Sequence, residues 1–178
     1  MSIAATIGMA ALENDLYLKQ AEVHGMSQRG GAVQSHMRLS DKEIFSDLIP
    51  KGSADIILSV EPMESLRYLP YLSPDGWLVT NTRAYRNISE YPDEQEVLGE
   101  IRKYKKYIAL DANDIASDIG SNRSSNIVML GAASPFFQIP FESFKEGLRK
   151  IFARKGDKVI DVNIQALEAG RAFADKNM

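Results

Sequence analysis

Cysteine is absent from this chain of 178 residues. Its absence excludes a disulfide framework, a thiolate nucleophile and a cysteine ligand set for an iron–sulfur cluster. Histidine occurs only twice, so a zinc site would need carboxylates to complete its coordination. We therefore expect no metal site in this chain by itself.

Long apolar runs are also missing. No run approaches the roughly 18 apolar residues that a membrane-spanning helix needs, and no basic stretch precedes an apolar run at the N-terminus, as it would in a signal peptide. We expect a cytoplasmic protein that does not enter a membrane. The chain has 21 basic and 24 acidic side chains, a net charge of -3. That balance argues against a nucleic-acid-binding surface, although it leaves a local basic patch open.

Several catalytic motifs are absent as well. The chain has no G-x-x-x-x-G-K-[ST] phosphate loop, no G-x-S-x-G nucleophile elbow and no G-D-G…N stretch of the kind that binds thiamine diphosphate. Together with the lack of thiols, these absences indicate that the chain alone carries out no redox chemistry.

The apolar pattern is that of one α/β domain covering residues 1–178, with a mixed, mostly parallel sheet flanked by helices. Glu61 and Pro62 open a predicted helix, and residues 73–76 have the proline and glycine placement of a type I turn. Strands are predicted at residues 16–22, 32–39, 54–60, 77–81 and 107–110. Helices are predicted at residues 2–14, from 62, within 92–107, and at 112–119, 126–133, 140–152 and 162–174.

Residues 22–38 form the most informative stretch, because a loop rich in polar donors separates two predicted strands. Adjacent glycines let a backbone or a ligand come close, and an arginine beside them presents five donors in a fixed fork. We predict that this loop faces a substrate, coenzyme A or a partner subunit; the alternative is a hairpin loop with a solvated arginine. The predicted loop residues are Glu22, His24, Gly25, Met26, Ser27, Gln28, Arg29, Gly30 and Gly31.

No catalytic residue can be assigned with certainty. His24 lies beside Glu22, which could hold one imidazole tautomer, so His24 is a weak candidate for a general acid or base. A structural hydrogen-bonded histidine is the competing interpretation. His36, in the middle of a predicted strand, is interpreted as structural.

A second group of candidates follows the predicted strands and helices. Glu61 stands at the carboxyl end of an apolar strand, where open α/β sheets bind ligands, although a carboxylate there also suits the first turn of the next helix. Arg29, Arg83 and Arg123 could together hold an anionic group, but the sequence does not show that they converge. The secondary candidates are Glu61, Asn81, Arg83, Arg123 and Asn126.

The same residues resemble a known family. The run HGMSQRGGAV from His24, followed by SHMR from Ser35, is similar to the signature of the gamma-type domain of 2-oxoacid:ferredoxin oxidoreductases. With Glu22 and Val23 in front, it most resembles the beta subunit of indolepyruvate ferredoxin oxidoreductase. Further matches follow in family order: Leu48-Ile49-Pro50, 54–58, Glu61-Pro62, Glu64, 66–69, Asn81-Thr82, Asn126 and Leu130-Gly131-Ala132.

The resemblance implies a fold like domain III of pyruvate:ferredoxin oxidoreductase. It also implies oxidative decarboxylation of a 2-oxoacid, such as indolepyruvate or another arylpyruvate, with coenzyme A to acyl-CoA, CO2 and reduced ferredoxin. Thiamine diphosphate, Mg2+ and [4Fe-4S] clusters would lie on a large partner subunit, and ferredoxin would be reached through the complex. The alternative is a stand-alone binding module that has kept the fold without redox activity.

The resemblance has one departure at the N-terminus. Family members open with a strand and a G-x-G-G-Q-G turn, after which their residues resemble this chain from Ser2 onward. We expect a strand and a glycine-rich turn upstream of Met1. The alternatives are a shorter fold, or another chain or water in the place of that strand.

Overall fold

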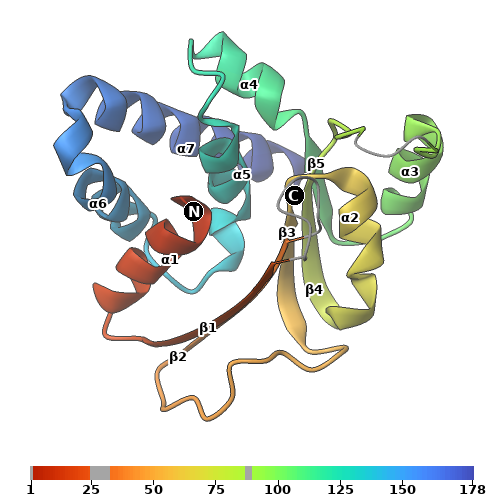
Figure 1. Ribbon diagram of the computed structural model, residues 1–178, viewed down its shortest axis with the longest axis horizontal. Coiled ribbons are helices and arrows are strands. Elements are labelled where there is room, and N and C mark those ends of the chain that lie inside the picture. The colour runs from red at the N-terminus through yellow and green to blue at the C-terminus, as the bar shows by residue number, and fades with distance from the viewer. Residues whose placement is uncertain (1, 25–32, 87–89) are drawn as a thin grey trace.

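The computed structural model describes residues 2–24, 33–86 and 90–178 of the chain. Its strands form a central layer that helices cover on both faces (Figure 1). In the described part of the chain, no helix combines the length and the apolar character that crossing a bilayer requires.

The described strands form two sheets. They are β1 (Tyr17–His24), β2 (Val33–Ser40), β3 (Ala54–Ser59), β4 (Leu72–Asn81) and β5 (Tyr107–Leu110). β1 and β2 are an antiparallel hairpin, whereas β3, β4 and β5 are parallel in that order. The predicted α/β fold class is confirmed. The single mixed sheet is not observed, because no described strand lies between β2 and β3 to bond both.

The helices alternate with the parallel strands, as the sequence pattern predicts. They are α1 (Ser2–Leu12), α2 (Pro62–Arg67), α3 (Glu94–Ile101), α4 (Ala112–Asp118), α5 (Ser125–Ala133), α6 (Phe141–Phe152) and α7 (Asp157–Asn177). Three short 3-10 helices, η1 (Leu69–Tyr71), η2 (Ser134–Phe136) and η3 (Ala153–Lys155), join neighbouring elements.

Two apolar clusters occupy the two faces of the strand layer. The larger one joins α1, α5, α6 and α7 to one face and includes Val79. The smaller one joins α2 and α3 to the other face and includes Leu78. Because adjacent residues of a strand point to opposite faces, β4 is anchored in both clusters at once. It is therefore the central strand of the fold.

The close crossing of α5 and α7 fixes the helical layer on the larger cluster. A Cβ atom at Gly131 would overlap the carbonyl oxygen of Leu167, and one at Gly170 would overlap the carbonyl oxygen of Val128. Both glycines are thus required by backbone contact between the two helices. This crossing holds α5 firmly under the strand layer.

Three local predictions differ from the structure. Residues 73–76 are part of β4 and not a turn: Gly76 has no room for a side chain, since a Cβ would lie 2.7 Å from the carbonyl oxygen of Ala54 at an irregularity in the β3–β4 register. The helix predicted within residues 92–107 is shorter than that range, since α3 ends at Ile101 and the basic residues follow it. α7 begins at Asp157, directly after Gly156, which has a φ of 85°.

Candidate functional site

The loop predicted from the sequence lies mostly outside the described residues. Residues 25–32 and the side chain of His24 are not described, so the functional interpretations of Gly25, Met26, Ser27, Gln28, Arg29, Gly30 and Gly31 remain predictions. Glu22 is exposed on β1, where its carboxylate accepts a hydrogen bond from Gln20 at 3.2 Å. The backbone of His24 pairs with Val33, so the loop leaves the hairpin at the level of Val33.

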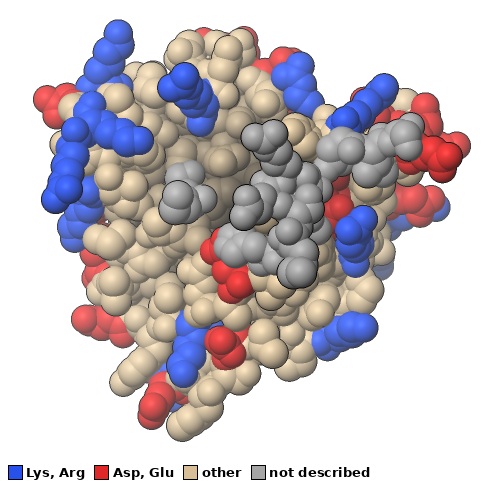
Figure 2. Space-filling view, in the orientation of Figure 1, with Lys and Arg blue, Asp and Glu red and all other residues tan. Residues whose placement is uncertain are grey.

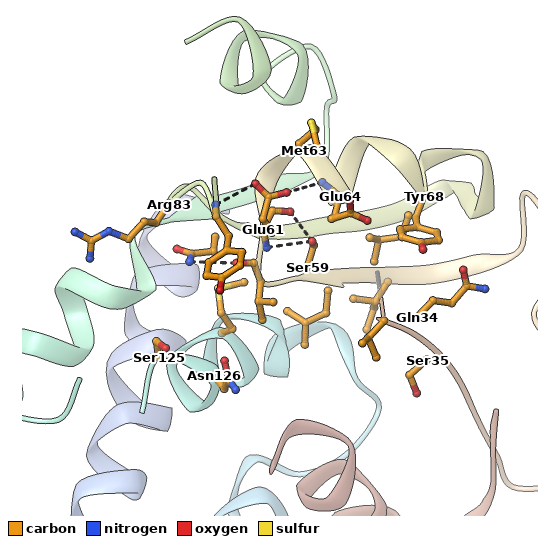
Figure 3. A pocket seen from close by; sticks show the side chains of 18 of the residues that line it. Gln34, Ser35, Ser59, Glu61, Met63, Glu64, Tyr68, Arg83, Ser125 and Asn126 are labelled. Carbon is orange, nitrogen blue, oxygen red and sulfur yellow. Dashed lines mark hydrogen bonds between the residues drawn. The ribbon is translucent and has the colours of Figure 1, made fainter. Parts of the chain in front are cut away.

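Val33 also marks the rim of a cavity of about 640 Å3. Its walls are the start of β2, all of β3 except Asp55, the start of α2 and the first residues of α5 (Figure 3). Figure 2 shows uncharged residues over much of the middle of this face, with charged side chains around its rim. The described end of the hairpin, at Val33, therefore lies at the rim of the cavity.

Glu61 lies at the end of the cavity formed by the carboxyl ends of the parallel strands. Its side chain is only 9% exposed, and both carboxylate oxygens accept hydrogen bonds. One oxygen accepts the backbone N–H of Glu64 at 2.8 Å. The other accepts the hydroxyl of Tyr91 and, at 3.5 Å, the backbone N–H of Tyr85. Glu61 thus caps α2 and also fastens the connection between β4 and α3 (Figure 3). Both sequence interpretations of Glu61 are compatible with this position.

The Tyr91–Glu61 contact changes the acidity of the tyrosine. Burial of the phenol, followed by its hydrogen bond to the Glu61 carboxylate and the negative charge there, raises the pKa of Tyr91 well above its ordinary value. Tyr91 therefore remains protonated and acts as a hydrogen-bond donor at neutral pH. The hydrogen bond between Tyr91 and Glu61 therefore holds the two side chains in place.

Asn81 ties three elements together beside Glu61. Its amide nitrogen donates to the carbonyl oxygen of Val60 at 3.3 Å and to the side-chain oxygen of Asn113 at 3.0 Å. Its amide oxygen accepts the backbone N–H of Ala112 at 3.1 Å. A buried amide with all these bonds holds the ends of β3 and β4 against the start of α4, so the structure gives Asn81 a positioning role.

Of the three arginines considered for an anionic group, Arg83 and Arg123 are described, and they do not share a site. Arg83 is exposed and lines the cavity, and in Figure 3 its side chain points away from Glu61. Arg123 is exposed and lies outside the cavity wall, whereas its near neighbours Ser125 and Asn126 are part of that wall. Among the described candidates, Glu61, Asn81, Arg83 and Asn126 share the cavity, and Arg123 does not.

His36 is buried in a hydrogen-bonded position, which confirms its structural interpretation. Its Nδ1 accepts the backbone N–H of Ile49 at 3.0 Å, so the proton of the neutral ring sits on Nε2. That nitrogen lies 2.6 Å from the side-chain amide of Gln34, which must present its oxygen to accept the proton. The ring also packs edge-on against Tyr71. His36 therefore fastens β2 to the segment before β3.

Sequence reasoning missed Tyr91 and Asn113. Tyr91 lies in the connection between β4 and α3, Asn113 is the second residue of α4, and neither belongs to a motif. Their partners are Glu61 and Asn81, which are 30 and 32 positions away. Only folding brings these pairs together, so no local signal could have identified them.

The donor set of the chain does not fit the cofactors that the family resemblance implies. Cysteine is absent from the sequence, so no thiolate can ligate an iron–sulfur cluster. Among the described residues, no group of three or more histidines or carboxylates comes close enough to hold a metal ion. No chemical step is therefore assigned to such a group on this chain.

Comparison with known proteins places the chain in a family. Residues 1–173 match the family described as pyruvate ferredoxin/flavodoxin oxidoreductase. The indolepyruvate oxidoreductase subunit IorB of Archaeoglobus fulgidus is 34% identical over 96% of this chain and 87% of its own length. The IorB subunit of Thermococcus kodakarensis is 36% identical with the same coverage. The resemblance found in the sequence is confirmed.

A solved structure has the same fold. The 2-oxoglutarate:ferredoxin oxidoreductase of Magnetococcus marinus, with 2-oxoglutarate, coenzyme A and succinyl-CoA bound, superimposes with a TM-score of 0.74 at 22% identity. The match covers 99% of this chain, which spans 29% of the length of that larger chain. From the family match and the two relatives, the chain belongs to the pyruvate ferredoxin/flavodoxin oxidoreductase family.

Proposed function

We propose that this chain is a subunit of an indolepyruvate-type 2-oxoacid:ferredoxin oxidoreductase. The observation that carries the proposal is the similarity to two IorB subunits, 34% and 36% identical over 96% of the chain. The predicted signature loop lies inside that aligned length. Substrates of this type are arylpyruvates such as indolepyruvate.

The reaction of the complex is oxidative decarboxylation. The bond between the carboxylate carbon and the oxo carbon breaks and releases CO2, the acyl group is transferred to the thiol of coenzyme A, and the released electrons pass to ferredoxin. Thiamine diphosphate, Mg2+ and [4Fe-4S] clusters belong to the large partner subunit, since this chain has no ligands for a cluster.

The contribution of this chain is to position groups at the interface. The signature loop and the end of the cavity that contains Arg83, Ser125 and Asn126 supply donors for an anionic part of coenzyme A or of the 2-oxoacid. Glu61 and Asn81, which are buried and fully bonded, hold this end of the cavity in place. Support for this assignment comes from their common position at the carboxyl ends of β3 and β4.

Co-expression with the large subunit tests the proposal. The assembled complex should reduce ferredoxin with indolepyruvate and coenzyme A at a higher kcat/KM than with pyruvate or 2-oxoglutarate. The large subunit alone serves as the control. If the two proteins do not co-purify, or if pyruvate is the preferred substrate, the indolepyruvate assignment is wrong.

Substitution of Arg29 tests the loop. Arg29→Ala should lower kcat/KM of the complex far more than it lowers the stability of this subunit, because a surface substitution away from special features changes stability by only about 0.5 kcal/mol. Equal activity of the mutant and wild-type complexes would leave the solvated-loop interpretation.

The alternative function is a stand-alone small-ligand-binding module without redox activity. A neighbouring reading frame with a thiamine-diphosphate motif and ferredoxin-type cysteines favours the subunit. A chain that binds coenzyme A equally well with and without the large subunit favours the module.

A further inference from the structure

Four tyrosines line the cavity, and three of them have a partner for the side chain. Tyr68 and Tyr71 lie near each other, with ring centroids 6.4 Å apart, and Tyr91 donates its hydroxyl to Glu61. Tyr85 is 70% exposed. Within the described part of the chain, no aromatic ring packs on that of Tyr85 and no hydrogen bond reaches its hydroxyl. Its ring is therefore the one available for contact with a ligand.

The backbone that carries this ring is held in place. The backbone N–H of Tyr85 donates to the carboxylate of Glu61 at 3.5 Å. The next residue, Arg86, forms an ion pair with Glu94 at the start of α3, with 2.7 Å between Nη2 and Oε1. The two bonds hold the chain at the end of β3 and at the start of α3. The exposed ring of Tyr85 is thus presented on a backbone that is fixed before any ligand binds, which lowers the ordering cost of binding.

Tyr91 supports the same arrangement through Glu61. Its hydroxyl donates to Oε1 of Glu61, the same oxygen that accepts the backbone N–H of Tyr85. One buried carboxylate oxygen therefore joins two points of the connection between β4 and α3. Without the hydroxyl of Tyr91, the connection would depend on the longer bond from Tyr85. Tyr91 is thus placed to act on Tyr85 without touching a ligand itself.

The surroundings of Tyr85 indicate the kind of ligand. Val60, which precedes Glu61, is 50% exposed and lines the cavity. Arg83, two positions before Tyr85, is exposed at the same end of the cavity as Glu61 (Figure 3). Aromatic rings bind planar groups by offset stacking or edge contact, and a guanidinium binds anions. The combination suits a ligand that joins a planar ring to an anionic group.

Two substrates of the proposed reaction have this composition. An arylpyruvate joins an aryl ring to a 2-oxo carboxylate, and coenzyme A joins adenine to phosphates. Pyruvate and phosphopantetheine are the matching compounds without the ring. A stacking contact at Tyr85 would therefore favour one of the ring-bearing compounds over its ring-free counterpart.

We propose that Tyr85 is a specificity-determining residue that stacks on a planar aromatic group of a substrate, and that Glu61 and Tyr91 are the residues that position it. The inference rests on the proposed function, because the stacked group belongs to a substrate of that reaction. The aryl group of the 2-oxoacid and the adenine of coenzyme A offer the same chemistry, and the experiment separates them.

The experiment measures kcat/KM of the complex with the large subunit for indolepyruvate against pyruvate, and for coenzyme A against phosphopantetheine. Tyr85→Ala should lower kcat/KM about tenfold for the ring-bearing member of one pair, and less than about twofold for its ring-free member. Tyr85→Phe, which returns the ring, should recover most of that loss. Tyr104→Ala is the matched control, because Tyr104 is 39% exposed and lies outside the cavity wall.

The positioning role of Tyr91 has its own readout. Tyr91→Phe should raise KM for the same ring-bearing substrate and leave kcat nearly unchanged. Combined with Tyr85→Ala it should cause no further loss, because both substitutions act on one contact. A purely structural role of Tyr91 would instead lower kcat for every substrate and add to the effect of Tyr85→Ala.

The pair that responds to Tyr85→Ala identifies the stacked group. Equal losses for ring-bearing and ring-free substrates in both pairs, no loss in either pair, or no recovery in Tyr85→Phe would overturn the proposal. The proposed function fails separately, if the wild-type complex does not prefer indolepyruvate to pyruvate. In that case the comparison of coenzyme A with phosphopantetheine still tests Tyr85.

Discussion

β3 and β4 are neighbouring strands of similar apolar character with very different surroundings. Ile57 of β3 and Leu78 of β4 are paired in register and lie in the same apolar cluster. Leu78 is 0% exposed, whereas Ile57 remains partly exposed. β4 has a strand on each side, while β3 has a described neighbour only at β4.

This difference shows that burial within a sheet depends on the neighbours along the edges as well as on the layers above and below. The sequence of β3 is that of an interior strand, and its side chains are partly exposed because they line the cavity. The same contrast extends to the strand ends, because Asn81 after β4 is bonded to three groups. The described hydrogen bonds of the Ser59 hydroxyl, at the end of β3, are both with the backbone of Glu61.

The largest effect is expected from substitutions in the apolar cluster that Leu78 and Ile57 share. Leu78→Ala should reduce the free energy of unfolding by about 2–5 kcal/mol, because it removes a fully buried side chain between closed layers. Ile57→Ala should cost roughly half as much, since part of its surface is already exposed. Urea denaturation measures both. Equal losses of unfolding free energy would mean that Ile57 is as well buried as Leu78, and that the edge of β3 is not open.

Substitutions of the polar residues at the ends of β4 and β3 should show the same order of stability losses, with the larger loss at β4. Asn81→Ala should cost about 1–3 kcal/mol, because it leaves the backbone N–H of Ala112 without its acceptor. Ser59→Ala should cost about 1 kcal/mol or less. Asn81→Asp is the comparison variant: it keeps an acceptor for Ala112 but turns a buried carboxylate oxygen toward the carbonyl oxygen of Val60 and the side-chain oxygen of Asn113, so its loss should be at least as large as that of Asn81→Ala.

A smaller, pH-dependent effect is expected at Tyr91. Tyr91→Phe should cost about 1 kcal/mol at neutral pH through the lost hydrogen bond to Glu61. The pKa of Tyr91 is raised in the folded protein, so its stabilising contribution is fully present below the ordinary tyrosine pKa near 10. That contribution is lost as the pH rises toward the folded-state value. Thermal melts at pH 8 to 11 should therefore fall less steeply for the mutant than for wild type.

The smallest effects on stability are expected at the exposed arginines. Arg83→Ala and Arg123→Ala should each change the free energy of unfolding by less than about 0.5 kcal/mol. In the complex with the large subunit, only Arg83→Ala should lower kcat/KM, because Arg83 lines the cavity and Arg123 does not. Equal losses from both variants would show that the cavity does not define the site.

Much of the local structure could be predicted from the sequence. β5 is observed at the predicted residues, and α2 begins at Pro62 with Glu61 as its cap. These elements depend on apolar periodicity and on capping residues within a few positions. The turn at 73–76 was wrong because Gly76 is required by the approach of Ala54, and no property of those four residues reports that contact.

The candidate site was predictable only in part. Glu61, Asn81, Arg83 and Asn126 were identified because they follow strands or open helices, and the structure places them around one cavity. Arg123 also lies next to the start of a helix, α5, but it is not among the residues that line the cavity. Position at the end of an element limits where a residue can be, but not the direction in which the loop carries its side chain.

The sequence by itself determined the α/β class, the family and the absence of cluster ligands, because periodicity, motif order and composition belong to the chain. Tertiary structure alone decided which distant groups meet, such as Glu61 with Tyr91 and Asn81 with Asn113. It also decided that β4 pairs with a strand on each side while β3 borders the cavity. The physical reason is that hydrogen bonding and burial depend on neighbours in space, and a strand has the same sequence whether its edge is paired or open.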